Sequence, residues 1–413
     1  MSLRTRHDFL RIWTGQVVST LGDGVHRIAV LWWAKQSTGS NVVLVAVALA
    51  TTLPGIVGGP ACGWLVDRFD RRRLMVAADG VRLAASAALA GAATSGRLTP
   101  WFVVTMSVLA AFAAAVFRPA YFASITRLVA DDELPAANSL VGVCEATAGV
   151  AGPALGGLLL GMLGTASALW IDAATFAVSA ALIAMSHIPP LLATERAQTG
   201  TGLWVGFALL RRRRALRDLT LVATSLNTLV APAGLLLVSL AAGPFRLGSA
   251  GFGLLDACLP AGMLVGFALA ARASRSRSAA VTALLGAGCC LGAVGATTVA
   301  AVGGVTLLAA GVCVSIANTV VQTRFQRAVE PAEQGRVFGL VSALADAGRP
   351  VGLVLAAPLL VVAGPRWGLA ACGLGMVTAT LVGRRGLTDD GDTLRAISHS
   401  GHILAGSSAT VER

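Results

Sequence analysis

Residues 63–73 read Gly63-Trp-Leu-Val-Asp67-Arg68-Phe-Asp70-Arg71-Arg72-Arg73, so a compact run of charges follows a short apolar segment. Apolar residues continue on both sides of the charges, near Val42 to Val66 and near Leu74 to Thr94. A helix that spans a bilayer needs about 20 mostly apolar residues. The stretch therefore predicts a short charged loop between two membrane-spanning helices.

Apolar runs of this length recur along the whole chain. The 413 residues are 55% hydrophobic and 13% charged, whereas soluble globular proteins carry about 25% charged residues. Twelve spans with short connections need roughly 300 to 400 residues. The sequence therefore predicts an all-α integral membrane protein with twelve transmembrane helices. The expected spans lie near Phe9 to Ala34, Val42 to Val66, Leu74 to Thr94, Trp101 to Phe122, Ala136 to Leu163, Thr165 to Met185, Leu219 to Ala242, Gly251 to Ala271, Ala279 to Ala301, Val302 to Thr323, Val337 to Val362 and Arg366 to Val382.

The predicted spans form two sets of six, and short segments of the two sets resemble each other. Arg127-Leu-Val-Ala-Asp-Asp-Glu133 is echoed two hundred residues later by Arg327-Ala-Val-Glu-Pro-Ala-Glu333. Two pseudo-symmetric six-helix halves are typical of alternating-access carriers. The expected divisions are an N-terminal half over 1–187, a linker with an amphipathic surface helix over 188–218, a C-terminal half over 219–386 and a tail over 387–413.

The basic residues indicate how the chain is oriented in the membrane. With these spans, roughly 24 basic residues fall on the side of the N-terminus and roughly 4 on the other side, and such residues are retained in the cytoplasm. Both termini are therefore expected to be cytoplasmic. The basic residues on the other side are Lys35, Arg97, Arg246 and Arg366.

Several functions are excluded or disfavoured by what the sequence lacks. Lys35 is the only lysine, so no G-x-x-x-x-G-K-[ST] phosphate loop exists to hydrolyse ATP. The 7 cysteines lack the paired spacing of a metal site, and no cofactor is expected. The arginines are scattered over successive loops, which disfavours nucleic-acid binding. A membrane enzyme or a lipid scramblase would need a catalytic His/Asp cluster or a lipid-facing polar groove, and neither is visible, so we expect no enzymatic activity.

The charged loop at 63–73 resembles the G-x-x-x-D-R-x-x-R-[RK] signature of the major facilitator superfamily, which joins its second and third helices. Gly149-Val-Ala-Gly152-Pro153-Ala-Leu-Gly156-Gly157 is similar to the G-P-x-x-G-G motif of its drug/proton antiporters. Further short motifs resemble the branch that includes the enterobactin-type siderophore exporter and bacterial macrolide and multidrug effluxers. These are Leu21-Gly22-Asp23, Ala78-Asp79-Gly-Val-Arg82, Phe117-Arg118-Pro119-Ala120, Ile171-Asp172-Ala173-Ala174-Thr-Phe176 and Gln334-Gly335-Arg336-Val337-Phe338.

The resemblance implies a secondary transporter that exports a hydrophobic or amphipathic small molecule in exchange for protons, acting as a monomer in a bacterial inner or plasma membrane. A dedicated exporter of one siderophore or self-made antibiotic is the alternative within transport. The family fold implies a substrate cavity between the halves, near the middle of the bilayer. Polar candidates for binding substrate there are Gln16, Asn227, Asn318 and Gln322.

The loop signature is expected to act as a conformational latch. In the family fold its aspartate lies close to the start of the eleventh helix, and a carboxylate near a helix N-terminus is stabilised by roughly 0.3 to 1 kcal/mol. That contact exists only while the cytoplasmic ends of the halves are together, which favours the outward-open state. The alternative for the flanking Arg71 and Arg73 is a solvated loop. The predicted latch residues are Gly63, Asp67, Arg68, Arg72 and Arg336.

The glycine and proline motif of the fifth span places several residues without side chains on one helical face. Close packing against another helix follows from this pattern. The functional interpretation is a bendable, leak-tight interface between the halves, and plain helix packing is the alternative. The motif comprises Gly149, Gly152, Pro153, Gly156 and Gly157.

Acidic residues inside spans are the candidates for proton coupling, because a charge in the membrane is costly enough to indicate function. Glu145 is the first candidate, since its neighbours at helical spacing offer no cation. Asp346 is second, with Arg349 three residues on, and Asp23 is third.

Local spacing also predicts two charge pairs within spans. Asp23 stands four residues before Arg27, and Asp79 stands three before Arg82, spacings at which side chains meet on a helix. Both pairs can be structural and neutralise themselves. Asp172 and Asp256 fall toward the outer ends of their spans, where water reaches easily, and His26 is expected to be a packing residue.

Overall fold

The computed structural model describes residues 3–130, 133–188, 214–273, 276, 278–328 and 331–388. All the regular elements within these ranges are helices. They are α1 (Leu3–Thr38), α2 (Asn41–Arg68), α3 (Arg71–Thr94), α4 (Pro100–Leu128), α5 (Leu134–Ala184), α7 (Arg214–Val230), α8 (Ala233–Ala242), α9 (Ser249–Ala273), α10 (Ala279–Ala296), α11 (Ala300–Ala328), α12 (Pro331–Pro358), the π-helix η2 (Leu359–Ala363) and α13 (Gly364–Thr388).

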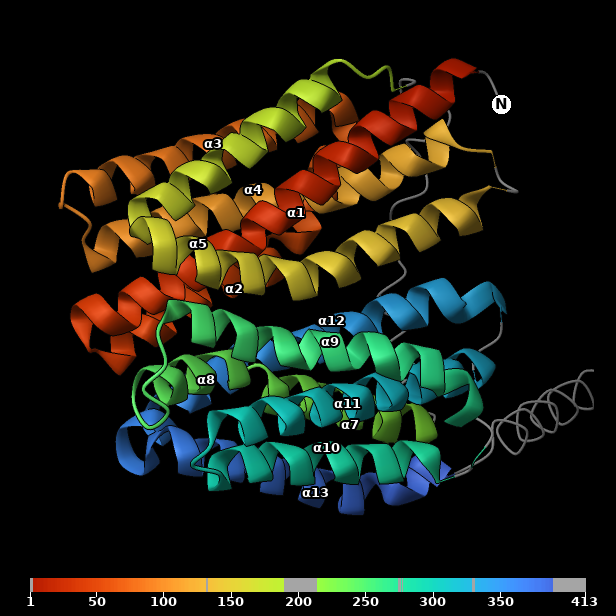
Figure 1. The fold of residues 1–413 in the computed structure, drawn as a ribbon. Helices are drawn as coiled ribbons and strands as arrows, with labels where there is room; N and C mark the ends of the chain where they lie inside the picture. The colour runs from red at the N-terminus through yellow and green to blue at the C-terminus, as the bar shows by residue number, and fades with distance from the viewer. Residues whose placement is uncertain are drawn as a thin grey trace, which may run out of the picture.

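The helices form two bundles that lie one above the other in Figure 1. Helices α1 to α5 pack mainly on one another, and we call them the N-terminal half. Helices α7 to α13 pack on one another in the same way and form the C-terminal half. The two bundles meet chiefly where α5 lies on α9 and where α2 lies on α12.

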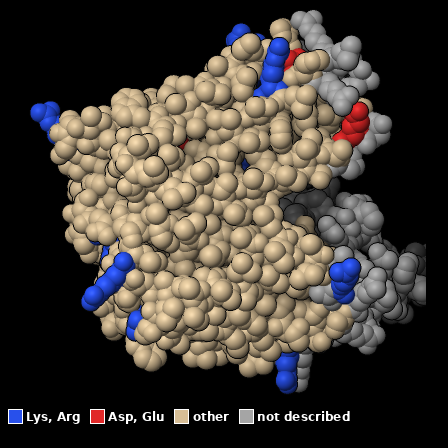
Figure 2. All heavy atoms as spheres, in the orientation of Figure 1, with Lys and Arg blue, Asp and Glu red and all other residues tan. Residues whose placement is uncertain are grey.

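Within the described residues, nine segments are long and apolar enough to cross a membrane. Two of these, at Ala136–Ala184 and Leu340–Arg384, each hold two consecutive spans. Helix α1 is also long enough to cross a membrane, but its charged residues lower its mean hydropathy. The helices are therefore compatible with the twelve predicted spans. Figure 2 shows a broad belt of uncharged residues around the molecule, with arginine and lysine side chains mainly near the two ends of the helices.

The turns between paired spans reveal the internal repeat most clearly. Gly164 has φ 79° and ψ 174° and divides α5 into the fifth and sixth spans. Gly364 has φ 74° and ψ 173° and divides α12 from α13 in the same way. Such backbone angles are accessible to glycine and strained for other residues. The same special turn thus stands at positions 200 residues apart, which supports two repeats of one six-helix plan.

Local sequence signals explain several helix boundaries. The Asp70 side chain accepts a hydrogen bond from the Arg73 backbone N–H at 2.8 Å and so caps the start of α3. Ser40 caps α2 through the N–H of Val43. The seventh span was predicted as one helix, but it is broken into α7 and α8 at Ala231 and Pro232, because proline has no N–H to donate. The predicted linker helix lies outside the described residues.

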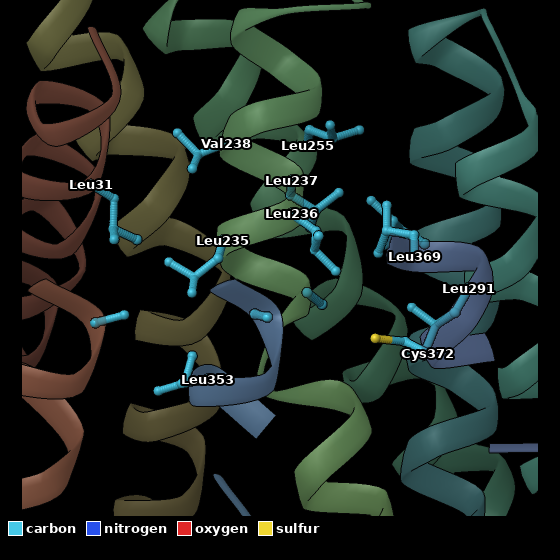
Figure 3. Close-up of a cluster of buried hydrophobic side chains, with 14 of the residues drawn as sticks. Leu31, Leu235, Leu236, Leu237, Val238, Leu255, Leu291, Leu353, Leu369 and Cys372 are labelled. Carbon is cyan, nitrogen blue, oxygen red and sulfur yellow. The ribbon is translucent and has the colours of Figure 1, made fainter. Parts of the chain in front are cut away.

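The two halves are closed against each other at the end of the bundle opposite to the start of α1, which we call the far end. Trp32 of α1 stacks on Phe252 of α9 with ring centroids 5.8 Å apart. Leucine side chains from both halves fill the space between them, and Figure 3 shows Leu31, Leu235 and Leu353 in this region of the core. Near the start of α1, by contrast, Figure 2 shows the surface notched between the halves.

Candidate functional site

A network of charged side chains lies inside the N-terminal half, where α1, α3 and the sixth span meet. Arg82 of α3 binds both carboxylate oxygens of Asp23 of α1, one of them at 2.5 Å. The same guanidinium contacts Asp79 at 3.3 Å and the Ser19 hydroxyl at 3.4 Å. Arg82 therefore joins two carboxylates on two different helices.

A third acidic residue, Asp172, extends the network. Asp172, on the sixth span, lies 2.8 Å from the Nδ1 atom of His26. It also accepts a hydrogen bond of 2.6 Å from the Ser86 hydroxyl of α3. Gly22 leaves room for the Asp172 side chain, because a Cβ atom at Gly22 would lie 3.0 Å from an Asp172 oxygen and 2.1 Å from the Thr175 hydroxyl.

The Arg82 guanidinium is enclosed by aromatic rings as well as by acids. Its central carbon lies 4.0 Å from the centre of the Phe176 ring and 5.9 Å from that of Phe117. A cation over an aromatic face is attracted by the ring quadrupole, and more strongly when water is excluded. Arg82 is buried, so the rings and the two carboxylates together fix its position.

The charges in this network do not balance. Asp23, Asp79 and Asp172 supply three carboxyl groups, whereas Arg82 is the one group that is always charged and His26 carries charge only when protonated. Asp79 and Asp172 are fully buried, while the Asp23 side chain is 46% exposed. Buried charges in a membrane protein need partners. The network consequently holds more acid than its cations neutralise and is suited to binding protons.

The predicted pair of Asp23 and Arg27 is wrong. Asp23 turns to Arg82, and Arg27 instead reaches across to the C-terminal half, where it contacts Asp256 of α9 at 2.5 Å. Asp256 and Asp172 were expected to be wetted, but both are buried and paired. Asp79 and Arg82, which were predicted from local spacing, are in contact. Arg27 and Asp256 form a salt bridge between the halves.

The prediction that no cation lies near Glu145 is also wrong. Glu145 was expected to lack a cation, but Arg118 of α4 lies 3.6 Å away, and the two side chains are 51% and 71% exposed. Asp346 lies 3.5 Å from Arg349, as local spacing indicates, and both are about half exposed. The Arg349 guanidinium also donates to the Asn227 side-chain oxygen at 3.1 Å.

The other polar residues proposed for substrate binding differ in their exposure. Gln16 is partly buried and donates to the Thr20 hydroxyl at 3.0 Å, so it is engaged within α1. Asn318 and Gln322 are exposed on α11.

The glycine and proline motif contacts both halves, so it is not only an interface between them. A Cβ atom on Gly152 or Gly156 would lie 3.0 Å from Gly24 or 2.9 Å from Val25 of α1, within the N-terminal half. A Cβ atom on Gly157 would instead lie 2.5 Å from the Ser249 carbonyl oxygen of α9. Gly149 faces Pro260 of the same helix. Pro153 is buried within α5, and its carbonyl approaches Gly253 of α9.

We predict that Gly157→Ala separates α5 from α9 at the far end, because the new methyl group overlaps the backbone of α9. Overpacking of this kind costs about 1 to 3 kcal/mol. Spin labels at Met162 and Leu254, both exposed, would report the separation as a longer distance between the helices. Gly142→Ala is the matched control, since a Cβ atom there meets nothing within 4 Å. Equal distances in Gly157→Ala and the wild type would contradict the prediction.

The predicted latch is only partly visible. The side chains of Asp67 and Arg336 and the surroundings of Gly63 are not described, and Arg68 is exposed at the end of α2. Arg72 donates a hydrogen bond to the Ala184 carbonyl oxygen at the end of α5. In this conformation Arg72 thus contacts its own half.

A cavity of about 230 Å³ lies between the halves, next to the charged network. Helices α1 and α2 form one wall, and α8 and α12 form much of the other. Its polar lining includes His26, Arg27, Thr51, Thr52 and Arg349, and the remaining lining residues are mainly apolar.

Comparison with known proteins agrees with this architecture. The family model of the Major Facilitator Superfamily matches residues 12–353, so the chain belongs to that superfamily. The chain is 26% identical to macrolide efflux protein A of Streptococcus pyogenes, over 84% of this chain and 88% of that protein. It is 30% identical to the multidrug efflux pump Tap of Mycobacterium tuberculosis, over 89% and 91%. The crystal structure of the nucleoside transporter NupG superposes with a TM-score of 0.74 at 11% identity, over 93% and 100%.

Proposed function

We propose that this protein is a secondary active transporter that exports hydrophobic or amphipathic drug-like molecules in exchange for protons. Its membership of the superfamily and its similarity to proteins named as macrolide and multidrug effluxers support export. The observation that carries proton exchange is the acid surplus of the Asp23, Asp79, Asp172, Arg82 and His26 network. Its work is transport and not catalysis, and it acts as a monomer in the plasma membrane.

Asp23 is the acid through which the network exchanges protons. Its side chain is about half exposed, whereas the Asp79 and Asp172 side chains are fully buried, so a proton that enters the network can reach Asp23 first. Protonation removes the negative charge that holds Arg82 and leaves the guanidinium to Asp79 and the two phenylalanine rings. The network therefore has two charge states. A substrate that binds better to one of them is linked reciprocally to the proton.

Transport also requires that the site open alternately to the two sides of the membrane. In the present conformation the halves are closed at the far end through the Arg27–Asp256 salt bridge and the α5–α9 contact. Near the start of α1, Glu145 and Gly142 of α5 are exposed. With the N-terminus in the cytoplasm this is an inward-open state, and rocking of the halves about the cavity would expose the site to the other side.

Two further groups have supporting roles in this scheme. Asp67, with Gly63, Arg68, Arg72 and Arg336, forms a latch that favours the outward-open state. Glu145 and Asp346 are secondary proton carriers, because each lies on a membrane span and has an arginine as its partner. They are weaker candidates than Asp23, because neither belongs to a network with further buried carboxylates such as Asp79 and Asp172.

Expression in a bacterial host that lacks its own effluxers tests the function. We expect resistance to macrolides and dyes to rise, and preloaded ethidium to leave the cells faster than from cells with the empty vector. Collapse of the proton gradient with an uncoupler should abolish the difference. Export that persists without the proton gradient would contradict proton coupling, and no export across a panel of macrolides, dyes and siderophores would contradict the function.

The cytoplasmic position of both termini is tested by cysteine labelling in a variant without the 7 native cysteines. We expect an impermeant maleimide to label Ser95→Cys, in the exposed turn after α3, on intact cells. Ser276→Cys, exposed between α9 and α10, should react only after permeabilisation. The reverse pattern would contradict the orientation.

A further inference from the structure

The charged side chains that line the cavity between the halves are all basic. Arg27 and Arg349 line it from opposite halves, and His26 lines it beside Arg27. Among the described residues, no carboxylate contributes to its wall. The Thr51 and Thr52 hydroxyls add polar groups from α2. We call this site, with His26, Arg27, Thr51, Thr52 and Arg349, the basic pocket.

The acids that neutralise these cations do not line the pocket. Asp172 pairs with His26 at 2.8 Å and is fully buried. Asp256 pairs with Arg27 at 2.5 Å and is 8% exposed. Asp346 pairs with Arg349 from the preceding turn of α12 at 3.5 Å. Each acid fixes the position of its cation but leaves donors uncovered, because the Arg27 and Arg349 side chains remain 45% and 54% exposed.

This arrangement suits an anion. A guanidinium presents several N–H donors in a planar fork that matches the two oxygens of a carboxylate. Hydrogen bonds with charged partners are stronger than neutral ones, and the surrounding low dielectric increases the attraction. A cationic group would meet positive charge here, and the half-exposed carboxylates of Asp23 and Glu145 lie outside this wall.

The apolar lining of the pocket determines which kind of molecule can carry the anionic group. Leu31, Leu235 and Leu353 belong to its apolar lining, and Figure 3 shows them in the core between α1, α8 and α12. The volume of about 230 Å³ is smaller than the roughly 300 to 1,000 Å³ of sites that enclose a drug-sized ligand. The pocket can therefore take a charged head group and a short apolar segment, while the remainder of a ligand extends beyond it.

We propose that the basic pocket is a substrate subsite that binds the carboxylate, or a similar single negative charge, of an exported amphipathic molecule. The proposal rests on the proposed export function and adds acidic amphiphiles to its substrates.

Binding of tritiated 1-naphthaleneacetic acid to the purified protein, compared with the uncharged 1-naphthaleneacetamide, tests the proposal. The two probes have nearly the same shape and differ in the charge of one group. In nanodiscs of phosphatidylcholine we expect the acid to bind at least tenfold more tightly than the amide. Arg349→Gln should reduce this preference to threefold or less, and Arg349→Lys should restore part of it. Arg118→Gln is the matched control, because Arg118 is an acid-paired arginine on a span outside the pocket, and it should retain the full preference.

Equal affinity for acid and amide, no saturable binding of either probe, or an unchanged preference in Arg349→Gln would overturn the proposal. Addition of phosphatidylglycerol to the nanodiscs should leave acid binding unchanged. Its loss there would assign the pocket to lipid head groups and also overturn the proposal. Ethidium export by wild-type cells separates this result from the proposed function. Export without an acid preference rejects the subsite alone, whereas an acid preference without export rejects the export function.

Discussion

Asp23→Asn is expected to abolish uphill transport while leaving downhill substrate exchange. With one proton exchanged per substrate, a gradient of one pH unit stores about 1.4 kcal/mol and supports about tenfold accumulation. Asparagine cannot bind and release that proton, so the accumulation ratio should fall to about one. Uptake of a radiolabelled macrolide into inverted vesicles, followed with and without an imposed pH gradient, measures the ratio.

Glu145→Gln is the matched control for that experiment, because it also removes one half-exposed carboxylate that is paired with an arginine. The variant should keep most of its gradient-driven accumulation. The opposite outcome, with full accumulation by Asp23→Asn and none by Glu145→Gln, would transfer the coupling role to Glu145.

Arg82→Gln should destabilise the protein far more than the loss of an exposed arginine does. Arg82 is buried and contacts both Asp23 and Asp79, so its removal leaves buried acid without its permanent cation. Loss of one partner from a buried charge pair costs about 3 to 5 kcal/mol. Denaturation of the purified protein in detergent, followed by the exposure of its cysteines to a thiol-reactive dye, would report the loss.

Two variants make that result interpretable. Arg118→Gln removes an arginine that is 71% exposed, and exposed pairs contribute about 0 to 1 kcal/mol. The double variant Arg82→Gln, Asp79→Asn removes one acid together with the cation, so it should recover part of the lost stability. Equal stability of Arg82→Gln and Arg118→Gln would contradict the structural importance of the network.

The sequence was sufficient for the membrane-spanning architecture, because each span carries its own signal of about 20 apolar residues. The internal repeat was visible in the Arg127 and Arg327 segments, and the matched turns at Gly164 and Gly364 support it. The break at Pro232 was not anticipated, although the proline itself was a signal for it.

The charged network was predicted only where it is local. Asp79 and Arg82 are three residues apart on one helix, so their contact follows from helical geometry. The same reasoning gave Asp23 the wrong partner, since α1 and α3 both pack on α5 and this places Arg82 in contact with Asp23. His26 and Asp172 are 146 residues apart, and Arg27 and Asp256 are 229 apart, so one sequence without its tertiary packing could not pair them.

Glu145 illustrates the same limit. Its neighbours along α5 carry no cation, but Arg118 approaches from α4. A useful signal was nevertheless present, because every acid and base inside a span is costly and must find a partner somewhere. The predicted spans of the N-terminal half hold as many arginines as acids, so the acid surplus of the network appears only once the tertiary pairing is known.

Substrate-induced proton release from the purified protein tests the central claim most directly. A weakly buffered solution of protein in detergent, with a pH indicator dye, is mixed with a saturating macrolide. We predict release of about one proton per wild-type molecule, almost none from Asp23→Asn, and wild-type release from Glu145→Gln, because substrate and proton are reciprocally linked. Undiminished release from Asp23→Asn would contradict the assignment of the proton site to the Asp23–Arg82 network.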